Sequence, residues 1–151
     1  MIKNNVLKIY VGCSLTHAPE EFKRQVDRLK SILRDIPGVE VLEFLGLSRG
    51  DCREVYVHDI TDCVNVCDLL IAICDHPAIG LGWEMAVQVE KRRRPLLAIA
   101  HCDAKITRLI QDPDVPNYRL VRYKDICVDI PPLVRLLVEA NLDMGALPKA
   151  A

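Results

Sequence analysis

The sequence lacks a net charge of either sign, a long apolar run, and a cleavable apolar segment near its start. Twenty basic and twenty-one acidic residues leave a formal charge of −1 over 151 residues. Such a balance excludes a general electrostatic attraction to nucleic acid polymers or anionic membranes. No apolar run approaches the length of a membrane span, and the opening MIKNNVLKIYVG is not typical of a secretion signal. We therefore expect a cytoplasmic protein with neither membrane nor nucleic-acid partners.

Paired cysteine motifs are also absent. The seven cysteines are an odd number, and they are scattered through segments expected to be strands and helices. Cys63 and Cys67 can share one helix face, but no second Cys or His pair completes a zinc site. With no secretion signal, reduced thiols are the natural interpretation. We predict thiols that act as buried small hydrophobes, with no metal site and no bound cofactor.

Strand-like and helix-like patterns alternate along the chain. Apolar runs typical of strands cover 6–12, 39–45, 68–74, 95–100 and 118–123, and helical patterns cover 19–36, 54–67, 82–93, 104–111 and 130–142. Such alternation implies right-handed crossovers and a mainly parallel sheet. We predict a single α/β domain over residues 1–151, with a five-stranded, flavodoxin-like or Rossmann-like sheet and helices on both faces. The tail, 143–151, carries no clear signal and either frays or docks on a partner.

Ligands of such sheets bind outside the carboxyl ends of the strands, where the strand order reverses. The loops expected there are 12–21, 46–53 and 75–83. In the first loop, Ser14, Thr16 and backbone amides can hold an anion, or one hydroxyl simply caps the following helix. The loop has neither the repeated glycines of a dinucleotide fingerprint nor a P-loop lysine. Both interpretations of the two hydroxyls stay open.

Glu84 follows the segment GLGW at the predicted start of a helix. Carboxylates are common in first turns because the helix dipole favours them, and the dipole is expected to help keep Glu84 ionised. However, the two glycines permit close approach of a ligand, and Trp83 offers a flat apolar surface. A carboxylate at the rim of the expected pocket suits nucleophilic or acid–base chemistry. We therefore favour a functional role for Glu84.

Other charged side chains are weaker candidates. Asp59 and Asp62 are three residues apart in a predicted helix and can share one face, although solvated helix charges are the default. Asp75 and His76 come directly after the third predicted strand, where a charged pair is less expected. No Ser/His/Asp order and no cluster of metal ligands emerges from the sequence.

The stretch DLLIAICDHPAIGLGWEMA resembles the signature of the nucleoside 2-deoxyribosyltransferase superfamily, and most closely its 2′-deoxynucleoside 5′-phosphate N-hydrolase branch. In that pattern an aspartate opens an apolar strand, and a proline and a Gly-x-Gly-aromatic-Glu turn follow. The matching residues are Asp68, Pro77, Gly80, Gly82, Trp83 and Glu84. The likeness extends more loosely from KIYVGCS to the closing helix.

The resemblance implies cleavage, or exchange of the base, at the N-glycosidic bond of nucleosides or their 5′-monophosphates, deoxy or ribo. Glu84 would attack the anomeric carbon and form a covalent glycosyl-enzyme, as in retaining glycoside hydrolysis. Asp59 is nearest to the protonating or sugar-orienting aspartate of the family, with Asp62 as the alternative. Thr107 falls on a hydroxyl residue that a neighbouring subunit contributes, which implies a homodimer with shared sites. The substrate is expected among Gly12, Ser14, Thr16, His17, Pro77, Gly80, Gly82 and Trp83.

One departure from the branch concerns the phosphate. The branch has an arginine- and glycine-rich loop after the first strand, where this chain has CSLTHAPEE, and Glu20 and Glu21 would repel an anion. Base and sugar recognition therefore carries over better than phosphate recognition, and His17 is either a substitute contact or a loop residue. The alternative function is a non-catalytic nucleotide-binding sensor or partner module of the same fold. A flavodoxin-like electron carrier is disfavoured because the loop has too few Ser, Thr and Gly residues.

Overall fold

The computed structural model describes residues 6–43 and 51–148, and it contains one parallel sheet with the strand order β2-β1-β3-β4-β5. Its strands are β1 (Leu7–Cys13), β2 (Val39–Leu42), β3 (Leu69–Ile73), β4 (Leu96–His101) and β5 (Tyr118–Tyr123). All of their pairings are parallel, so the predicted five-stranded parallel sheet is confirmed. The predicted loop 46–53 lies outside the described residues up to position 50, as do positions 44 and 45 of the second predicted strand.

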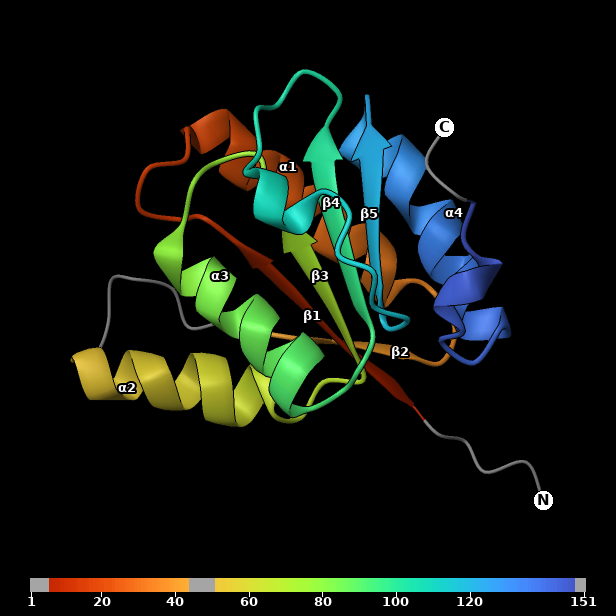
Figure 1. Cartoon of the computed structure of the whole chain (residues 1–151), viewed down its shortest axis with the longest axis horizontal. Helices are drawn as coiled ribbons and strands as arrows, with labels where there is room; N and C mark the ends of the chain where they lie inside the picture. Colours follow the sequence, from red (N-terminus) through yellow and green to blue (C-terminus); the bar gives the residue numbers. More distant parts are fainter. Residues whose placement is uncertain (1–5, 44–50, 149–151) are drawn as a thin grey trace.

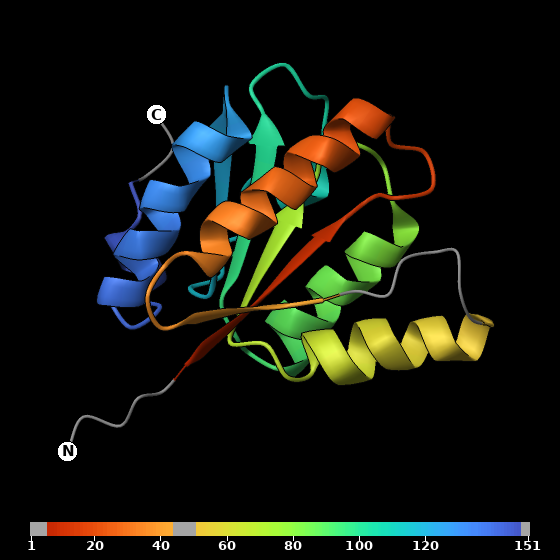
Figure 2. The ribbon, with the colours of Figure 1, turned by 180° about the vertical axis from the view of Figure 1, so that it is seen from behind.

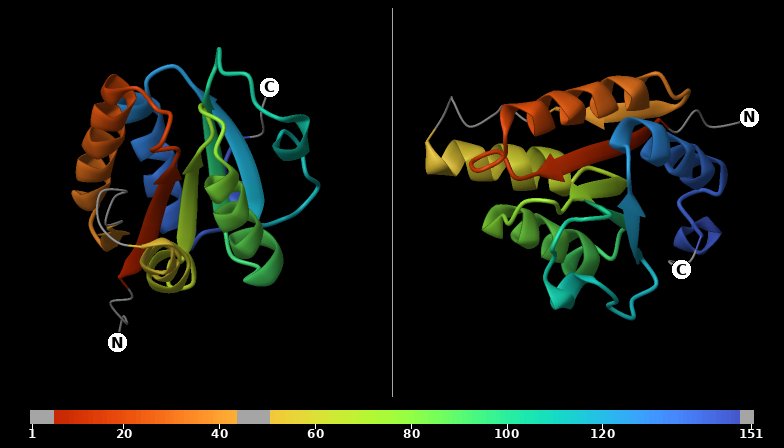
Figure 3. Two further views of the ribbon diagram at one scale, coloured as in Figure 1. Left: turned by 90° about the vertical axis from the view of Figure 1, so that its left-hand side faces the viewer. Right: turned by 90° about the horizontal axis from the view of Figure 1, so that it is seen from above.

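Helices cover both faces of the sheet, as predicted (Figure 1). The longer elements are α1 (Glu20–Arg34), α2 (Cys52–Tyr56), η1 (Val57–Val64), α3 (Ile79–Ala86), η2 (Val87–Lys91) and α4 (Ile126–Glu139), and the short 3₁₀ turns are η3 (Arg108–Ile110) and η4 (Met144–Ala146). Here η1 and η2 are π-helical continuations of α2 and α3. Helices α1 and α4 lie on one face (Figure 2), and α2 and α3 with their continuations lie on the other (Figure 3).

Each face of the sheet carries its own apolar core. The five residues of β3 are fully buried because helices cover that strand on both sides. Alternate residues of β1 divide between the two cores: Ile9 and Val11 pack against α1 and α4, whereas Tyr10 packs against η1 and α3. Gly12 shares the Tyr10 side of the strand by the same alternation. This period of two decides which β1 residues can reach a site on the α3 face.

The order of the strands places a switch point between β1 and β3. The chain leaves β1 toward β2 on one side and returns to β3 on the other, so the two connections diverge at the carboxyl ends of these strands. In addition, β2 pairs with β1 only as far as Tyr10. Within the described residues, the last part of β1 therefore has no neighbour on its β2 side. Both features open space beside the end of β1.

Several predicted helix boundaries were wrong. Helix α3 begins at Ile79 rather than at residue 82, so both glycines of the motif are helical. Helix α4 begins at Ile126 rather than at 130, because the side chain of Asp125 accepts a hydrogen bond from the Cys127 amide and caps it. Its two prolines therefore lie inside the helix. The predicted helix 104–111 reduces to the turn η3.

The described part of the tail docks on its own chain. Met144 and Leu147 are buried in the core between the sheet, α1 and α4. Met144 begins the turn η4, and Leu147 follows its end. The expectation of a tail that frays or docks on a partner is therefore wrong up to residue 148.

All seven cysteines are free thiols. Cys63 and Cys67 are buried as predicted, whereas Cys52 and Cys102 are exposed, so the prediction of buried thiols fails for them. In the described residues, no helix combines the length and apolarity that a bilayer span requires.

Candidate active site

A cavity of about 500 Å³ opens at the switch point between β1 and β3. Its walls come from the end of β1, the loop that follows it, the third turn of α1, η1 and the start of α3. The lining residues are Tyr10, Val11, Cys13, Ser14, Leu15, Thr16, His17, Lys30, Asp59, Pro77, Ala78, Ile79, Gly80, Leu81 and Glu84. The cavity therefore lies where the sheet topology predicts a ligand.

Glu84 lies in the second turn of α3, where it is the sixth residue of the helix. Its side chain is only 8% exposed and packs over β1. A Cβ atom placed on Gly12 would stand 2.9 Å from Oε2 of Glu84 and 3.0 Å from Cδ1 of Leu81. Any larger residue at position 12 would therefore force this carboxylate to shift. Gly12, which the sequence predicted as a substrate contact, is not among the residues that line the cavity and lies instead beside the Glu84 carboxylate.

The predicted help of the helix dipole for Glu84 is not found. Because α3 begins at Ile79, Glu84 lies beyond the first turn, where the field of the helix terminus has fallen off. Burial, together with the smaller effect of the nearby Asp59 charge, raises the pKa of Glu84 to about 8. The isolated protein thus holds this carboxyl largely protonated at neutral pH.

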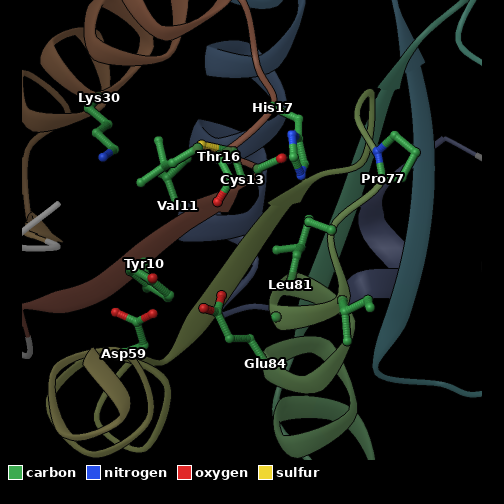
Figure 4. A pocket seen from close by; sticks show the side chains of 15 residues that line it. Tyr10, Val11, Cys13, Thr16, His17, Lys30, Asp59, Pro77, Leu81 and Glu84 are labelled. Atoms are coloured by element: carbon green, nitrogen blue, oxygen red, sulfur yellow. The ribbon is translucent and has the colours of Figure 1, made fainter. Parts of the chain in front are cut away.

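Asp59 faces the same cavity from the opposite wall (Figure 4). Its Oδ1 atom is buried and has no hydrogen-bond partner among the described residues. Burial raises the pKa of Asp59 to about 6, and the charge of His58 opposes this shift. The residue lies in the π-helical segment η1, a distortion that frequently occurs at functional sites. A buried carboxylate oxygen without a partner is a place where a ligand hydroxyl or a proton can bind.

The structure separates Asp59 from the alternative carboxylate. Asp62 does not line the cavity, and its exposed side chain pairs with His58, the distance between Nδ1 and Oδ2 being 3.2 Å. Asp59 and Asp62 therefore do not act together on one ligand, and of the two only Asp59 reaches the cavity.

Tyr10 is a cavity residue that the sequence interpretation missed. Its side chain is almost fully buried, and its pKa is raised above the ordinary value, first by burial and then by the charges of Glu84 and Asp59. Figure 4 shows it beside both carboxylates. The alternation of β1 was the available signal, since Tyr10 and Gly12 are two residues apart and face the same side.

The loop after β1 contributes the predicted Ser14, Thr16 and His17 to the cavity. The residue that precedes α1 is Pro19, and no side chain donates or accepts a capping hydrogen bond there. Neither hydroxyl therefore caps α1, and that interpretation is excluded. Ser14 is buried within the loop, while Thr16 and His17 point toward the cavity (Figure 4).

The structure does not bring Gly82, Trp83 and Thr107 into the cavity of their own chain. Trp83 is 61% exposed and lies along an apolar groove on the outer side of α3, with Ile79, Ala86 and Val87. The earlier start of α3 explains this position, because consecutive helical residues point about 100° apart and Glu84 takes the inward direction. Thr107 accepts a hydrogen bond from the Leu109 amide and caps η3.

Asp75 and His76 line a separate cavity between the ends of α1 and α4. Asp75 accepts hydrogen bonds from the amide of His101 at 2.7 Å and from the hydroxyl of Tyr123 at 2.9 Å, so it ties β3 to β4 and β5. His76 packs edge-on against Phe22. Both side chains therefore have structural partners away from Glu84.

One group of possible metal donors occurs in the described part of the chain, away from the cavity. The donor atoms of His101, Cys102 and Asp103 lie within 4.8 Å of one another in one turn after β4. Nδ1 of His101 already accepts a hydrogen bond from the Asp103 amide. Three consecutive residues, two of them exposed, form an incomplete set for a tetrahedral metal ion.

Comparisons with known proteins found one similar sequence and one similar solved structure. No protein-family model matches the chain. A relative from Syntrophotalea carbinolica, named "Putative 2′-deoxynucleoside 5′-phosphate N-hydrolase 1", is 32% identical over 94 residues. The match covers 62% of this chain and 64% of the relative, which is less than two thirds of the relative's length.

A solved structure shares the fold. The CMP N-glycosidase BcmB of Clostridium botulinum aligns with a TM-score of 0.63 over 84% of this chain and 98% of that chain, at 18% identity. The relative bears out the resemblance to 2′-deoxynucleoside 5′-phosphate N-hydrolases that residues 68–86 indicate, and the solved structure shows the shared fold.

Proposed function

We propose, on the premise of this likeness, that the chain cleaves the N-glycosidic bond of nucleosides or nucleoside 5′-monophosphates, with water or a second base as the acceptor. The observation that carries the proposal is the pair of carboxyl groups, Asp59 and Glu84, on opposite walls of one cavity at the switch point. Retaining glycosidases use such a pair, one group as nucleophile and the other as proton donor. The cavity volume of about 500 Å³ suits a ligand of nucleotide size.

In the first step, a carboxylate oxygen of Glu84 forms a bond to C1′ as the bond from C1′ to the base nitrogen breaks. The electron pair of that bond stays on the base, which takes a proton from Asp59. In the second step, water attacks C1′, its proton returns to Asp59, and the ester bond to Glu84 breaks. A second base can replace the water, in which case its N–H proton goes to Asp59.

The remaining cavity residues have binding roles in this proposal. Tyr10, beside both carboxylates, orients Glu84. Pro77 and Gly80 form the wall opposite the β1–α1 loop, where the planar base can lie against apolar surface. Ser14, Thr16 and His17 supply polar contacts for the sugar and its substituents.

A chromatographic assay of released base tests the proposal. The protein is incubated with a panel of deoxy- and ribonucleosides and their 5′-monophosphates, with and without a second base. Release of free base from at least one member supports hydrolysis, and formation of a new nucleoside supports transfer. A folded protein that releases no base from any member contradicts the enzymatic function and leaves the nucleotide-binding module as the better account.

The two raised pKa values predict the pH dependence of the reaction. Between pH about 6 and about 8 the pair Asp59 and Glu84 binds one proton, and the higher pKa of Glu84 places this proton mainly on Glu84. The first step therefore uses the minor form of the same charge, in which the proton has moved to Asp59 and Glu84 is ionised. We therefore expect kcat/KM to be bell-shaped, with limbs near these two values. Below the window both groups are protonated and no nucleophile is present, and above it no proton donor remains.

The variant Asp59→Asn separates the two limbs. It removes the proton donor, and it also removes the negative charge that raises the pKa of Glu84. Its residual activity should therefore have no alkaline limb. The activity should instead rise with pH as Glu84 ionises, with a midpoint below the pH of the native alkaline limb. A native profile without an alkaline limb would contradict the role of Asp59 as acid.

We also propose that two copies of the chain form a homodimer in which Thr107 of one copy completes the cavity of the other. Exposed apolar residues support an interface on this side: Ile79 is 94% exposed, Trp83 61% and Leu109 82%. Helix α3 and the turn η3 lie on the same side of the sheet (Figure 3). Burying such side chains is favourable, and isolated monomers rarely leave several large ones uncovered.

Mixing two impaired variants tests the shared site. Glu84→Gln and Thr107→Val should each lose activity, whereas a mixture allowed to exchange subunits should regain part of it, because one site of each mixed dimer then has both native residues. Sedimentation velocity should show a dimer for the native chain and a shift toward monomer for Trp83→Asp. A native monomer, or no recovery on mixing, contradicts the shared site.

A further inference from the structure

Helix α1 carries a basic residue that differs from its neighbours. Lys23 pairs with Glu20, Arg24 with Glu21 and Arg34 with Glu43, whereas Arg28 has no ion-pair partner among the described residues and lines the separate cavity with Asp75. Lys30 forms no ion pair or hydrogen bond to any described residue, and it is the one lysine or arginine of the described chain that lines the cavity with Glu84. A half-buried ammonium group without a carboxylate partner is available to bind an anion.

Lys30 reaches the cavity from α1, which lies on the opposite face of the sheet from Glu84. It lines the cavity together with Val11 and Cys13 at the end of β1. Cys13, which ends β1, lies near enough for the Lys30 charge to oppose the rise in its pKa that burial causes. Figure 4 shows the side chain of Lys30 at the margin of the cavity, beside Val11.

The cavity consequently has two ends of different character. Asp59 and Glu84 lie together at one end, and Lys30, Thr16 and His17 lie at the other (Figure 4). A sugar with C1′ held at Glu84 extends its 5′ position away from the two carboxylates. A dianionic group at that position is then separated from the negative charges and approaches the ammonium group and the hydroxyl.

We propose that Lys30 is the residue that selects 5′-phosphorylated substrates over unphosphorylated nucleosides, by pairing with the phosphate from helix α1. This inference rests on the proposed function, and it reverses the sequence-based expectation that phosphate recognition is weak because the β1–α1 loop has no arginine. The loop contributes hydroxyl donors, and the helix contributes the charge.

The test compares Lys30→Met with Lys30→Arg on one 5′-monophosphate and its matching nucleoside. A charge-assisted pair predicts that Lys30→Met lowers kcat/KM for the monophosphate by about ten- to hundred-fold and changes that for the nucleoside by less than about two-fold. Lys30→Arg should restore most of the preference. Lys124→Met is the control: it removes the same charge from an exposed lysine that does not line this cavity.

The outcomes separate this inference from the proposed function. Equal losses on both substrates, or no loss on either, overturn the role of Lys30 while base release still supports the enzyme. If no substrate releases base, calorimetric titration of the monophosphate into native and Lys30→Met protein decides the question without turnover. Binding that is weakened about ten-fold or more by Lys30→Met, and not by Lys124→Met, supports the inference. Equal binding to the native protein and the variant contradicts it.

Discussion

Glu84→Gln is expected to abolish base release and, at the same time, to make the fold more stable in alkaline solution. Glutamine has nearly the same shape but is too weak a nucleophile to form the glycosyl ester. Loss of the attacking group should lower kcat on the order of 10³-fold or more. Because the side chain is buried, its polar end remains in the cavity and the local packing is preserved.

The gain in stability follows from the raised pKa of Glu84. The carboxyl has a pKa of about 8 in the folded chain and an ordinary value of 4.5 when exposed, so the folded protein binds this proton more tightly than the unfolded chain does. The stability that the protonated carboxyl contributes is fully present below pH 4.5 and is lost as the pH rises through about 8. Above that pH, burying the charge costs on the order of a few kcal/mol. The neutral amide of Glu84→Gln avoids this cost.

Thermal unfolding at pH 4.5 and pH 9 measures the effect. The variant should melt close to the native protein at the acidic pH and higher than the native protein at the alkaline pH. Glu139→Gln, which changes an exposed carboxylate on α4, should shift neither melting temperature nor base release. A variant that keeps its activity would show that another group is the nucleophile. A constant difference in melting temperature would show that Glu84 does not titrate in this range.

The sequence predicts the sheet well because buried parallel strands have an unambiguous pattern. The LLIAI run of β3 is apolar at every position, and the prediction for β5 agrees with the structure residue by residue. Helix ends are less well predicted, since they depend on single caps. The predicted start of the last helix at residue 130 was late, because Asp125 provides a cap that starts α4 at Ile126. The start of α3 at Ile79 is marked by no side-chain cap, and this start points Trp83 outward and leaves Glu84 beyond the first turn.

The site was predictable where a local motif fixes the residue and not where the tertiary fold brings residues together. Pro77, Gly80 and Glu84 belong to one continuous stretch, and all three line the cavity. Lys30 was missed because α1 lies on the opposite face of the sheet from Glu84 (Figure 2), and only the folded chain brings its third turn to the cavity. The raised pKa of Glu84 depends on burial against β1 and on the charge of Asp59. Both come from other parts of the fold, so the sequence of α3 alone does not predict them.

Gly12→Ala is expected to lower kcat about 100-fold while leaving the protein folded. The new methyl group would stand 2.9 Å from Oε2 of Glu84, closer than the atoms can approach. The backbone of Gly12 cannot yield, because it is held in register opposite Ala72 of β3. The carboxylate is the end of a flexible side chain, so it moves instead. A displacement of this size at a reacting group is enough to reduce turnover by roughly two orders of magnitude.

The separation between turnover and stability makes this substitution informative. Overpacking by one methyl group should cost only about 1–3 kcal/mol of unfolding free energy, since Glu84 and Leu81 can shift their side-chain ends. Gly145→Ala is a matched control, because its methyl group would stand 3.1 Å from Oδ1 of Asp143, a slightly longer contact with another carboxylate outside the cavity. Unchanged kcat in a folded Gly12→Ala protein would mean that the reactive position of Glu84 is not the one above Gly12. A large loss of kcat with the control unaffected ties catalysis to the position of this one carboxylate.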